Sequence, residues 1–114
     1  MTVGDIHWVE LPATNGHEQQ GRRPAVILQD DQFGRVLPLV FVIPLTTSPH
    51  ALRFAGTLRI QPTDENGLVR ESIALVFQLR AVDRRRIREY IGRLRAHELD
   101  EVFQLLDRLT GRIR

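Results

Sequence analysis

The amino-acid sequence predicts one mainly β domain that ends in an amphipathic helix, with the strands forming a small barrel or a strongly bent antiparallel sheet. Three observations support this fold class. Short apolar segments recur along most of the chain, and turn-forming residues separate them. The last apolar segment instead repeats at three- and four-residue steps. The 114 residues suffice for one hydrophobic core, so residues 1–114 are expected to form a single domain.

The first half of the chain is expected to contribute three strands. These strands cover residues 6–11, 25–29 and 39–45, which are mainly apolar. A loop over residues 12–22, rich in Gly, Asn, Gln and Thr, joins the first strand to the second. A turn at Gly34 joins the second strand to the third.

The second half is expected to contain three further strands, over residues 56–60, 72–79 and 90–94. The Asn-Gly pair that ends residues 63–67 tolerates positive φ, which predicts a turn there. Asp83 is expected to cap a short helical turn before the last strand.

The clearest single element is a helix over residues 97–109. Its apolar residues recur at helical spacing, and they are Leu99, Val102, Phe103, Leu106 and Leu109. Gly111 then supplies a C-terminal stop. We expect the apolar face of this helix to cover the sheet or to pack against a partner.

The charge composition allows two interpretations. All 16 basic residues are arginine, and the calculated isoelectric point is about 10.3. Guanidinium groups fit phosphate, but a coding bias toward arginine would give the same composition. The net charge of +2 is low for a nucleic-acid-binding protein, so composition alone favours the bias. The absence of cysteine excludes disulfides and thiolate zinc sites.

No membrane segment is predicted. The longest apolar run, residues 36–45, is too short to cross a bilayer and contains two prolines. Polar residues interrupt the first dozen positions, which argues against a secretion signal. A cytoplasmic protein is therefore expected.

Four stretches of the chain carry a family resemblance. Residues 4–11 read GDIHWVEL, residues 15–24 read NGHEQQGRRP, residues 38–48 read PLVFVIPLTTS and residues 78–83 read QLRAVD. In this order and spacing, the chain resembles the MazF/PemK toxins, including their Kid-like members. A G-x-E-Q-x-G-x-R-P loop followed by a P-x-T-[TS] strand end is a specific combination.

The resemblance implies an SH3-like barrel that forms a homodimer, binds single-stranded RNA in a groove across the dimer and cuts it sequence-specifically without a metal. It also implies the toxin of a type II toxin–antitoxin system. Its partner would be a MazE-like antitoxin whose acidic, disordered tail fills the groove. The expected RNA products carry 2′,3′-cyclic phosphate and 5′-hydroxyl ends.

The residues present suit chemistry without a metal or another cofactor. No His-x-x-x-His spacing occurs, and we interpret Asp30 and Asp31 as a solvated turn because adjacent residues of a strand point to opposite faces. RNA brings its own nucleophile, the 2′-hydroxyl. Cleavage then requires only a base, an acid and donors that stabilise the charge on phosphorus.

Four residues are the catalytic candidates. Pro24 forces Arg23 into an extended conformation at a strand mouth, where its guanidinium can clamp the scissile phosphate. Thr46 resembles the family's strand-end hydroxyl, a donor to a phosphate oxygen. His17 and Glu18 are the candidates for proton transfer, and which of them is the base stays open.

Further polar residues of the same motifs are candidates for RNA binding. Gln19 and Gln20 can read base edges, and Arg22 can reach flanking phosphates. The remaining candidates follow the catalytic hydroxyl or match the family's Q-x-R motif, and they are Thr47, Ser48 and Arg80.

One pair departs from the family pattern. Kid-like relatives carry an arginine and an acid as the acid–base pair where this chain has Leu75 and Phe77. Phe77 is expected in the core of an apolar strand, although stacking on a base is the alternative. The roles of that pair must therefore pass to other residues.

Residues 80–95 hold a local excess of arginine that allows two interpretations. The excess would bind RNA or an acidic antitoxin tail, or it would form a solvated helix face. The whole chain also has alternatives of other classes. One is a gyrase poison of the CcdB type, although this chain ends Gly-Arg-Ile-Arg, where those relatives typically end Trp-Gly-Ile. The other is an RNA-binding barrel without catalysis.

Overall fold

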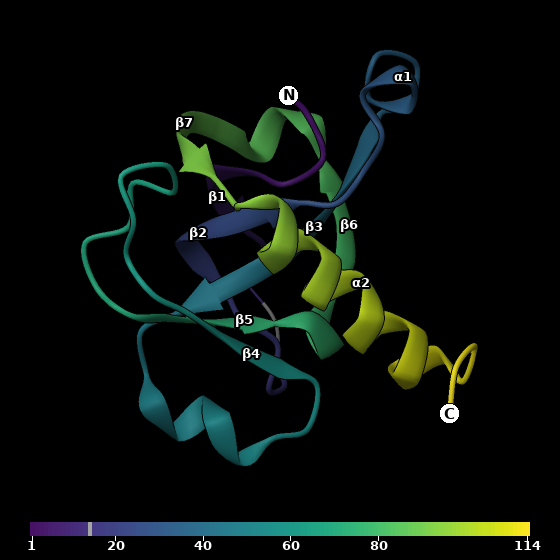
Figure 1. Cartoon of the computed structure of the whole chain (residues 1–114). Helices are drawn as coiled ribbons and strands as arrows, with labels where there is room; N and C mark the ends of the chain where they lie inside the picture. Colours follow the sequence, from purple (N-terminus) through teal and green to yellow (C-terminus); the bar gives the residue numbers. More distant parts are fainter. Residues whose placement is uncertain (14) are drawn as a thin grey trace.

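A computed structural model describes residues 1–13 and 15–114, in which seven strands form one antiparallel sheet (Figure 1). The strands are β1 (Asp5–Leu11), β2 (Gly21–Ile27), β3 (Leu39–Thr46), β4 (Thr57–Ile60), β5 (Ser72–Leu75), β6 (Arg80–Asp83) and β7 (Ile87–Arg93). The helices are α1 (Asp31–Gly34) and α2 (Ala96–Thr110), and the 3₁₀ turns are η1 (Pro49–Arg53), η2 (Val76–Gln78) and η3 (Arg84–Arg86).

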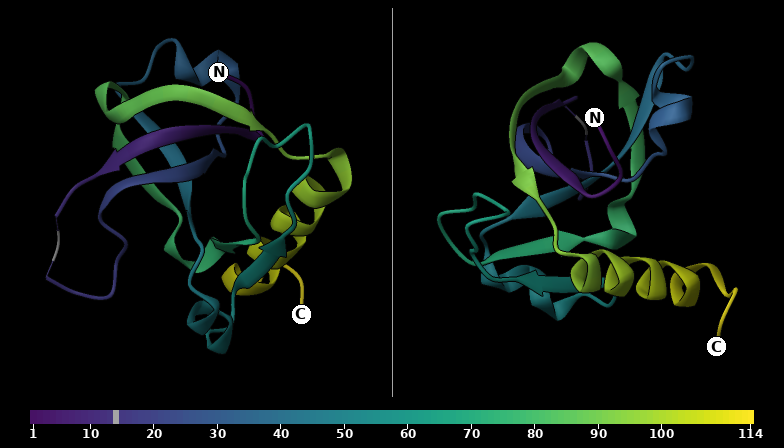
Figure 2. Two further views of the ribbon diagram at one scale, coloured as in Figure 1. Left: turned by 90° about the vertical axis from the view of Figure 1, so that its left-hand side faces the viewer. Right: turned by 45° about the horizontal axis from the view of Figure 1, so that its top comes forward.

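The sheet has the order β4-β5-β3-β2-β1-β7, and β6 also pairs with β3. One edge of β3 pairs with β2, and the other is divided between two partners, because its first half pairs with β6 and its last two residues pair with β5. The strands therefore curl around a common interior, and α2 lies against the outside (Figure 2). This arrangement confirms the predicted fold class, a mainly β fold with a C-terminal helix.

The apolar side chains divide into two buried clusters. The larger cluster includes Ile43, Ile60 and Val102, so the apolar stripe of α2 closes it from one side. The smaller cluster gathers Val9, Val40 and other inward residues of the strands around β1, β2 and β3. The predicted helix is confirmed, including its left-handed stop at Gly111 with φ 79°. Within the described residues, no helix has the length and apolar character needed to span a membrane.

The predicted strand over residues 72–79 is wrong in its second half. The register explains the break: Leu45 pairs with Ala74, whereas Val42 pairs with Arg80. A step of three residues along β3 is thus matched by a step of six along the segment from Ala74 to Arg80, and the three extra residues form η2. Phe77 lies in η2 with 40% of its surface exposed, so its expected core position is also wrong.

A hairpin between β2 and β3 projects from the body and carries α1 (Figure 1). The expected turn at Gly34 is therefore a short helix. The Gln29 side chain closes the base of the hairpin: its Nε2 donates to the Leu39 carbonyl at 3.3 Å, and its Oε1 accepts from the Phe41 N–H at 3.0 Å.

Candidate active site

Arg23 and Thr46 lie at neighbouring ends of β2 and β3 and line the same pocket. Arg23 is half-buried, and its Nε donates to the Gln20 carbonyl at 3.2 Å. Thr46 is buried, and its Oγ1 accepts from the Ser48 N–H at 3.2 Å. Because the oxygen is the acceptor there, the hydroxyl hydrogen of Thr46 stays available for a ligand.

This cavity, which we call the Trp8 pocket, has a volume of about 400 Å³. Four segments supply most of its walls: the middle of β1, the first half of β2, the end of β3, and the loop between β4 and β5. The lining residues from these segments include Trp8, Arg22, Arg23, Pro24, Thr46, Thr47, Leu68, Val69 and Arg70.

Thr46 also borders a second cavity of about 250 Å³, the His17 pocket. The predicted residues His17, Gln19 and Ser48 line it as well. Its other walls come from η1, β5 and η2, and they include His50, Arg53, Phe54, Phe77 and Gln78. Thr46 is therefore the point at which the two cavities meet.

The loop over residues 15–20 is held in place by two side chains from another part of the chain. Gln78 accepts the Gln19 N–H at 2.8 Å and donates to the His17 carbonyl at 3.2 Å. The Arg80 guanidinium donates to the Gln19 carbonyl. Burial lowers the pKa of Arg80, and the nearby Glu18 carboxylate partly offsets this effect. Arg80 thus anchors the loop in this structure.

The structure separates the two proton-transfer candidates. His17 borders the His17 pocket together with Thr46. Both residues line a third cavity, with Leu79 and Arg80, but Glu18 lines neither of the two cavities that Thr46 borders.

Arg22 folds across Trp8, with its Cζ 4.8 Å from the centre of the indole, and it also pairs with Glu89. Strand alternation predicts that Arg22 faces away from Arg23, yet both residues line the Trp8 pocket. The side chain of Arg22 is long enough to return over the aromatic ring. The Arg22 guanidinium also holds the pKa of Glu89 below its usual range.

The arginine-rich segment is not a helix face, so that interpretation is wrong. Its arginines lie on β6, the 3₁₀ turn η3 and β7 and, for Arg95, at the N-cap of α2, and they are largely engaged. Ion pairs join acidic residues to four of them: Arg85 to Asp83, Arg88 to Glu10, Arg93 to Asp5 and Arg95 to Glu65. Arg80, Arg84 and Arg86 donate to backbone carbonyls. The positive excess is therefore partly neutralised.

The described residues contain no group of three His, Cys, Asp or Glu side chains that would hold a metal ion. Asp30 caps α1 by accepting the Gln32 N–H, and Asp31 pairs with Arg35. Both carboxylates therefore have structural partners.

Sequence reasoning missed three contributors to these cavities: Trp8, Gln78 and the Leu68–Arg70 wall. Trp8 is the single tryptophan, and it lies in a quoted motif without an assigned role. Gln78 belongs to the Q-x-R motif, so its position was visible but its contact with the loop was not.

Comparisons with known proteins agree on one family. The family profile described as PemK-like, MazF-like toxin of type II toxin–antitoxin system matches residues 2–110. The chain is 30% identical over 108 residues to endoribonuclease MazF of Staphylococcus epidermidis, covering 95% of this chain and 89% of that protein. It is 28% identical over 103 residues to endoribonuclease EndoA of Bacillus subtilis, covering 90% and 88%. The crystal structure of MazF from Deinococcus radiodurans superposes with a TM-score of 0.82 at 28% identity, covering 97% of this chain and 96% of that one.

Proposed function

The chain belongs to the PemK-like, MazF-like toxins of type II toxin–antitoxin systems, and we propose that it is an endoribonuclease that cuts single-stranded RNA through the RNA's own 2′-hydroxyl. The observation that carries this proposal is the meeting of Arg23 and Thr46 in one pocket at the ends of β2 and β3. A fixed cation and a buried hydroxyl donor on rigid strands are what a phosphorane-like transition state requires.

The reaction needs few groups. The 2′-oxygen attacks the adjacent phosphorus, its proton passes to a base, and the bond from phosphorus to the 5′-oxygen breaks as an acid protonates that oxygen. Arg23 and Thr46 stabilise the charge on the non-bridging oxygens. We assign the base to His17, because it shares a cavity with Thr46, whereas Glu18 lies beside Arg80. Water then supplies the proton to the leaving 5′-oxygen. Gln19, Gln20, Thr47 and Ser48 are then available to contact the strand on either side.

The proposal includes independence from metal ions, since the nucleophile and the stabilising charges come from RNA and from this chain. The test incubates the purified protein with a defined RNA in excess EDTA. Discrete fragments with 2′,3′-cyclic phosphate and 5′-hydroxyl ends are expected. Products with 5′-phosphate ends that appear only when Mg²⁺ is added would refute the internal-nucleophile mechanism.

The proposal extends to two protein partners. Structures of MazF with MazE from Deinococcus radiodurans, 27% identical to this chain with a TM-score of 0.74, support an antitoxin partner for the family. A second copy of this chain is proposed because Phe54, Phe77 and Leu109 leave apolar surface exposed beside α2. Light scattering at micromolar concentration should report a dimer, and a monomer would contradict it. The proposal also includes a cytoplasmic location, with which both partners are consistent.

A further inference from the structure

The Trp8 pocket contains more than the proposed phosphate anchors need, and the inference drawn from this rests on the proposed function. Arg23 and Thr46 are only two of its lining residues. Trp8, Arg22 and Arg70 line it as well and have no role in the proton transfers described above. A volume of about 400 Å³ lies in the range of sites that enclose a small molecule.

One wall of the pocket is a stacking platform. Trp8 is half-buried on β1, and the Arg22 guanidinium lies 4.8 Å from the centre of its ring. Glu89 holds that guanidinium from the outside. Nucleobases of single-stranded RNA stack on aromatic rings and on arginine planes, so this wall presents the two surfaces that bases use.

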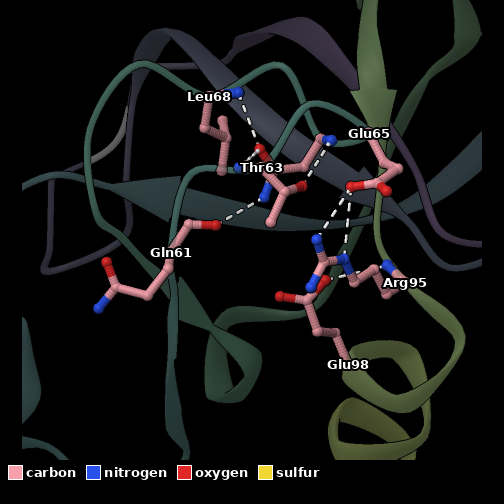
Figure 3. Close-up of polar contacts among 7 residues, drawn as sticks. Gln61, Thr63, Glu65, Leu68, Arg95 and Glu98 are labelled. Atoms are coloured by element: carbon pink, nitrogen blue, oxygen red, sulfur yellow. Dashed lines mark hydrogen bonds and ion pairs between the residues drawn. The ribbon is translucent and has the colours of Figure 1, made fainter.

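A second wall of the pocket, residues 68–70, starts from a rigid turn. Asn66 is fully buried; its Oδ1 accepts the N–H groups of Thr63 and Leu68, and its Nδ2 donates to the Gln61 carbonyl (Figure 3). Gly67 has φ +66° and approaches β7 so closely that a Cβ would lie 2.3 Å from the Ile91 carbonyl oxygen.

The same turn is tied to the start of α2, because Glu65 pairs with Arg95 (Figure 3). Two side chains of the wall beyond this turn, Val69 and Arg70, nevertheless lack contacts within the described part of the chain that would hold them. Val69 is 93% exposed, and no described residue forms an ion pair or hydrogen bond with the Arg70 guanidinium. The structure therefore fixes the backbone at the start of this wall and leaves the side chains of Val69 and Arg70 free for a ligand.

The hydrogen-bonding groups that line the pocket indicate which nucleobase it would bind. Among the described residues that line the pocket, three are arginines and none is a carboxylate or a side-chain amide. The charged side chains are thus hydrogen-bond donors only. Guanine presents two acceptors, O6 and N7, which an arginine fork binds together. On the edge that carries these two acceptors in guanine, adenine and cytosine present an amino donor, for which these arginines offer no acceptor, and uracil presents a single acceptor, O4.

We propose that the Trp8 pocket is a nucleobase subsite for a guanine next to the scissile phosphate. The base lies against the Trp8–Arg22 platform, and Arg70 reads its O6 and N7. Arg70 is then a specificity-determining residue, separate from the anchors of the phosphate.

The test sequences the cut sites that wild type and an Arg70→Gln variant make in a pool of RNA with random sequence. Wild type should enrich guanine at one position that flanks the cut. Arg70→Gln should reduce that enrichment by about tenfold, because one bidentate contact carries discrimination of this order. Arg35→Gln is the matched control, since Arg35 lies on the α1 hairpin and pairs only with Asp31 on the surface.

The outcomes separate the subsite from the function on which it rests. Cleavage by wild type with adenine or cytosine enriched beside the cut, or a guanine preference that survives Arg70→Gln, overturns the subsite and leaves the endoribonuclease intact. No cleavage by wild type overturns the proposed function. In that case Trp8, the single tryptophan, still reports on the pocket. Titration with GMP should change its fluorescence more than titration with AMP, and equal responses overturn the subsite as well.

Discussion

The turn at residues 63–67 and the loop at residues 15–20 each border a cavity that Thr46 also lines, yet they are secured in different ways. The turn is built around Asn66, which is fully buried and bonded to three backbone groups. The loop is exposed along most of its length and is held from outside by Gln78 and Arg80. One side of the candidate site is therefore preformed, whereas the other depends on a few surface contacts that RNA can strengthen or replace.

The largest expected effect on activity concerns the two proposed phosphate anchors, Arg23 and Thr46, which lie between the turn and the loop. Arg23→Ala and Thr46→Ala should each reduce RNA cleavage by about 10²–10³, because each removes one preorganised donor to the phosphate. Initial rates on a single-site RNA measure the loss, and circular dichroism checks the fold. Arg35→Ala serves as the surface control. Near-normal turnover in a folded Arg23→Ala protein would mean that the phosphate is bound elsewhere.

The next effect is on the free energy of unfolding, which a substitution in the preformed 63–67 turn should lower more than one in the 15–20 loop. Asn66→Ala should lower the free energy of unfolding by about 2–4 kcal/mol, since it leaves two buried N–H groups and a carbonyl without their partner. Asn15→Ala, the same change in the exposed 15–20 loop, should stay within about 0.5 kcal/mol of wild type. Urea unfolding curves compare the two. Equal losses would remove the contrast between the turn and the loop.

A smaller effect is expected on the other side. Gln78→Ala should release the loop and lower cleavage by about tenfold, while unfolding changes by about 1 kcal/mol, because exposed hydrogen bonds contribute little net stability. Gln104→Ala on α2, where the amide bonds only Asp100, is the control. If Gln78→Ala costs stability but not activity, the loop does not position His17.

The smallest effect concerns pH. The pKa of Glu89 is lowered by its hydrogen bond to Arg22, and the pKa of Glu10 is lowered by Arg88. A carboxylate with a lowered folded-state pKa stabilises the fold above its unfolded pKa, and this contribution is lost as the pH falls through the folded value. Urea unfolding should therefore show lower stability at pH 3 than at pH 6. Glu89→Gln should make that dependence slightly weaker, since the pair is exposed. An unchanged dependence would show that the Arg22–Glu89 contact does not persist in solution.

The sequence was sufficient for the elements whose patterns are local. The structure has the α2 stripe and its Gly111 stop, the Asp83 cap and the strand end at Thr46, and each of these depends on neighbouring residues. The break after Leu75 was not predictable from its own segment, since it follows from one edge of β3 pairing with both β5 and β6.

The contacts of the site were hidden for the same reason. Gln78 reaches the 15–20 loop across 59 and 61 residues of sequence. Residues 68–70 line the same pocket as Trp8 because Asn66 and Gly67, which precede them, pack against β7. Composition and periodicity carry no information about such long-range contacts.

The Gln29 side chain at the base of the α1 hairpin limits how far local unfolding can spread. A backbone hydrogen bond between the two arms joins the Leu28 N–H to the Phe41 carbonyl, and the Gln29 side chain adds two further bonds beside it, to the Phe41 N–H and the Leu39 carbonyl. Opening of the tip leaves these bonds intact, but opening past Gln29 breaks them and exposes buried backbone. Amide hydrogen exchange should therefore be fast through the tip and slow from Phe41 inward. The hairpin can unfold and refold while the strands that present Arg23 and Thr46 stay in register.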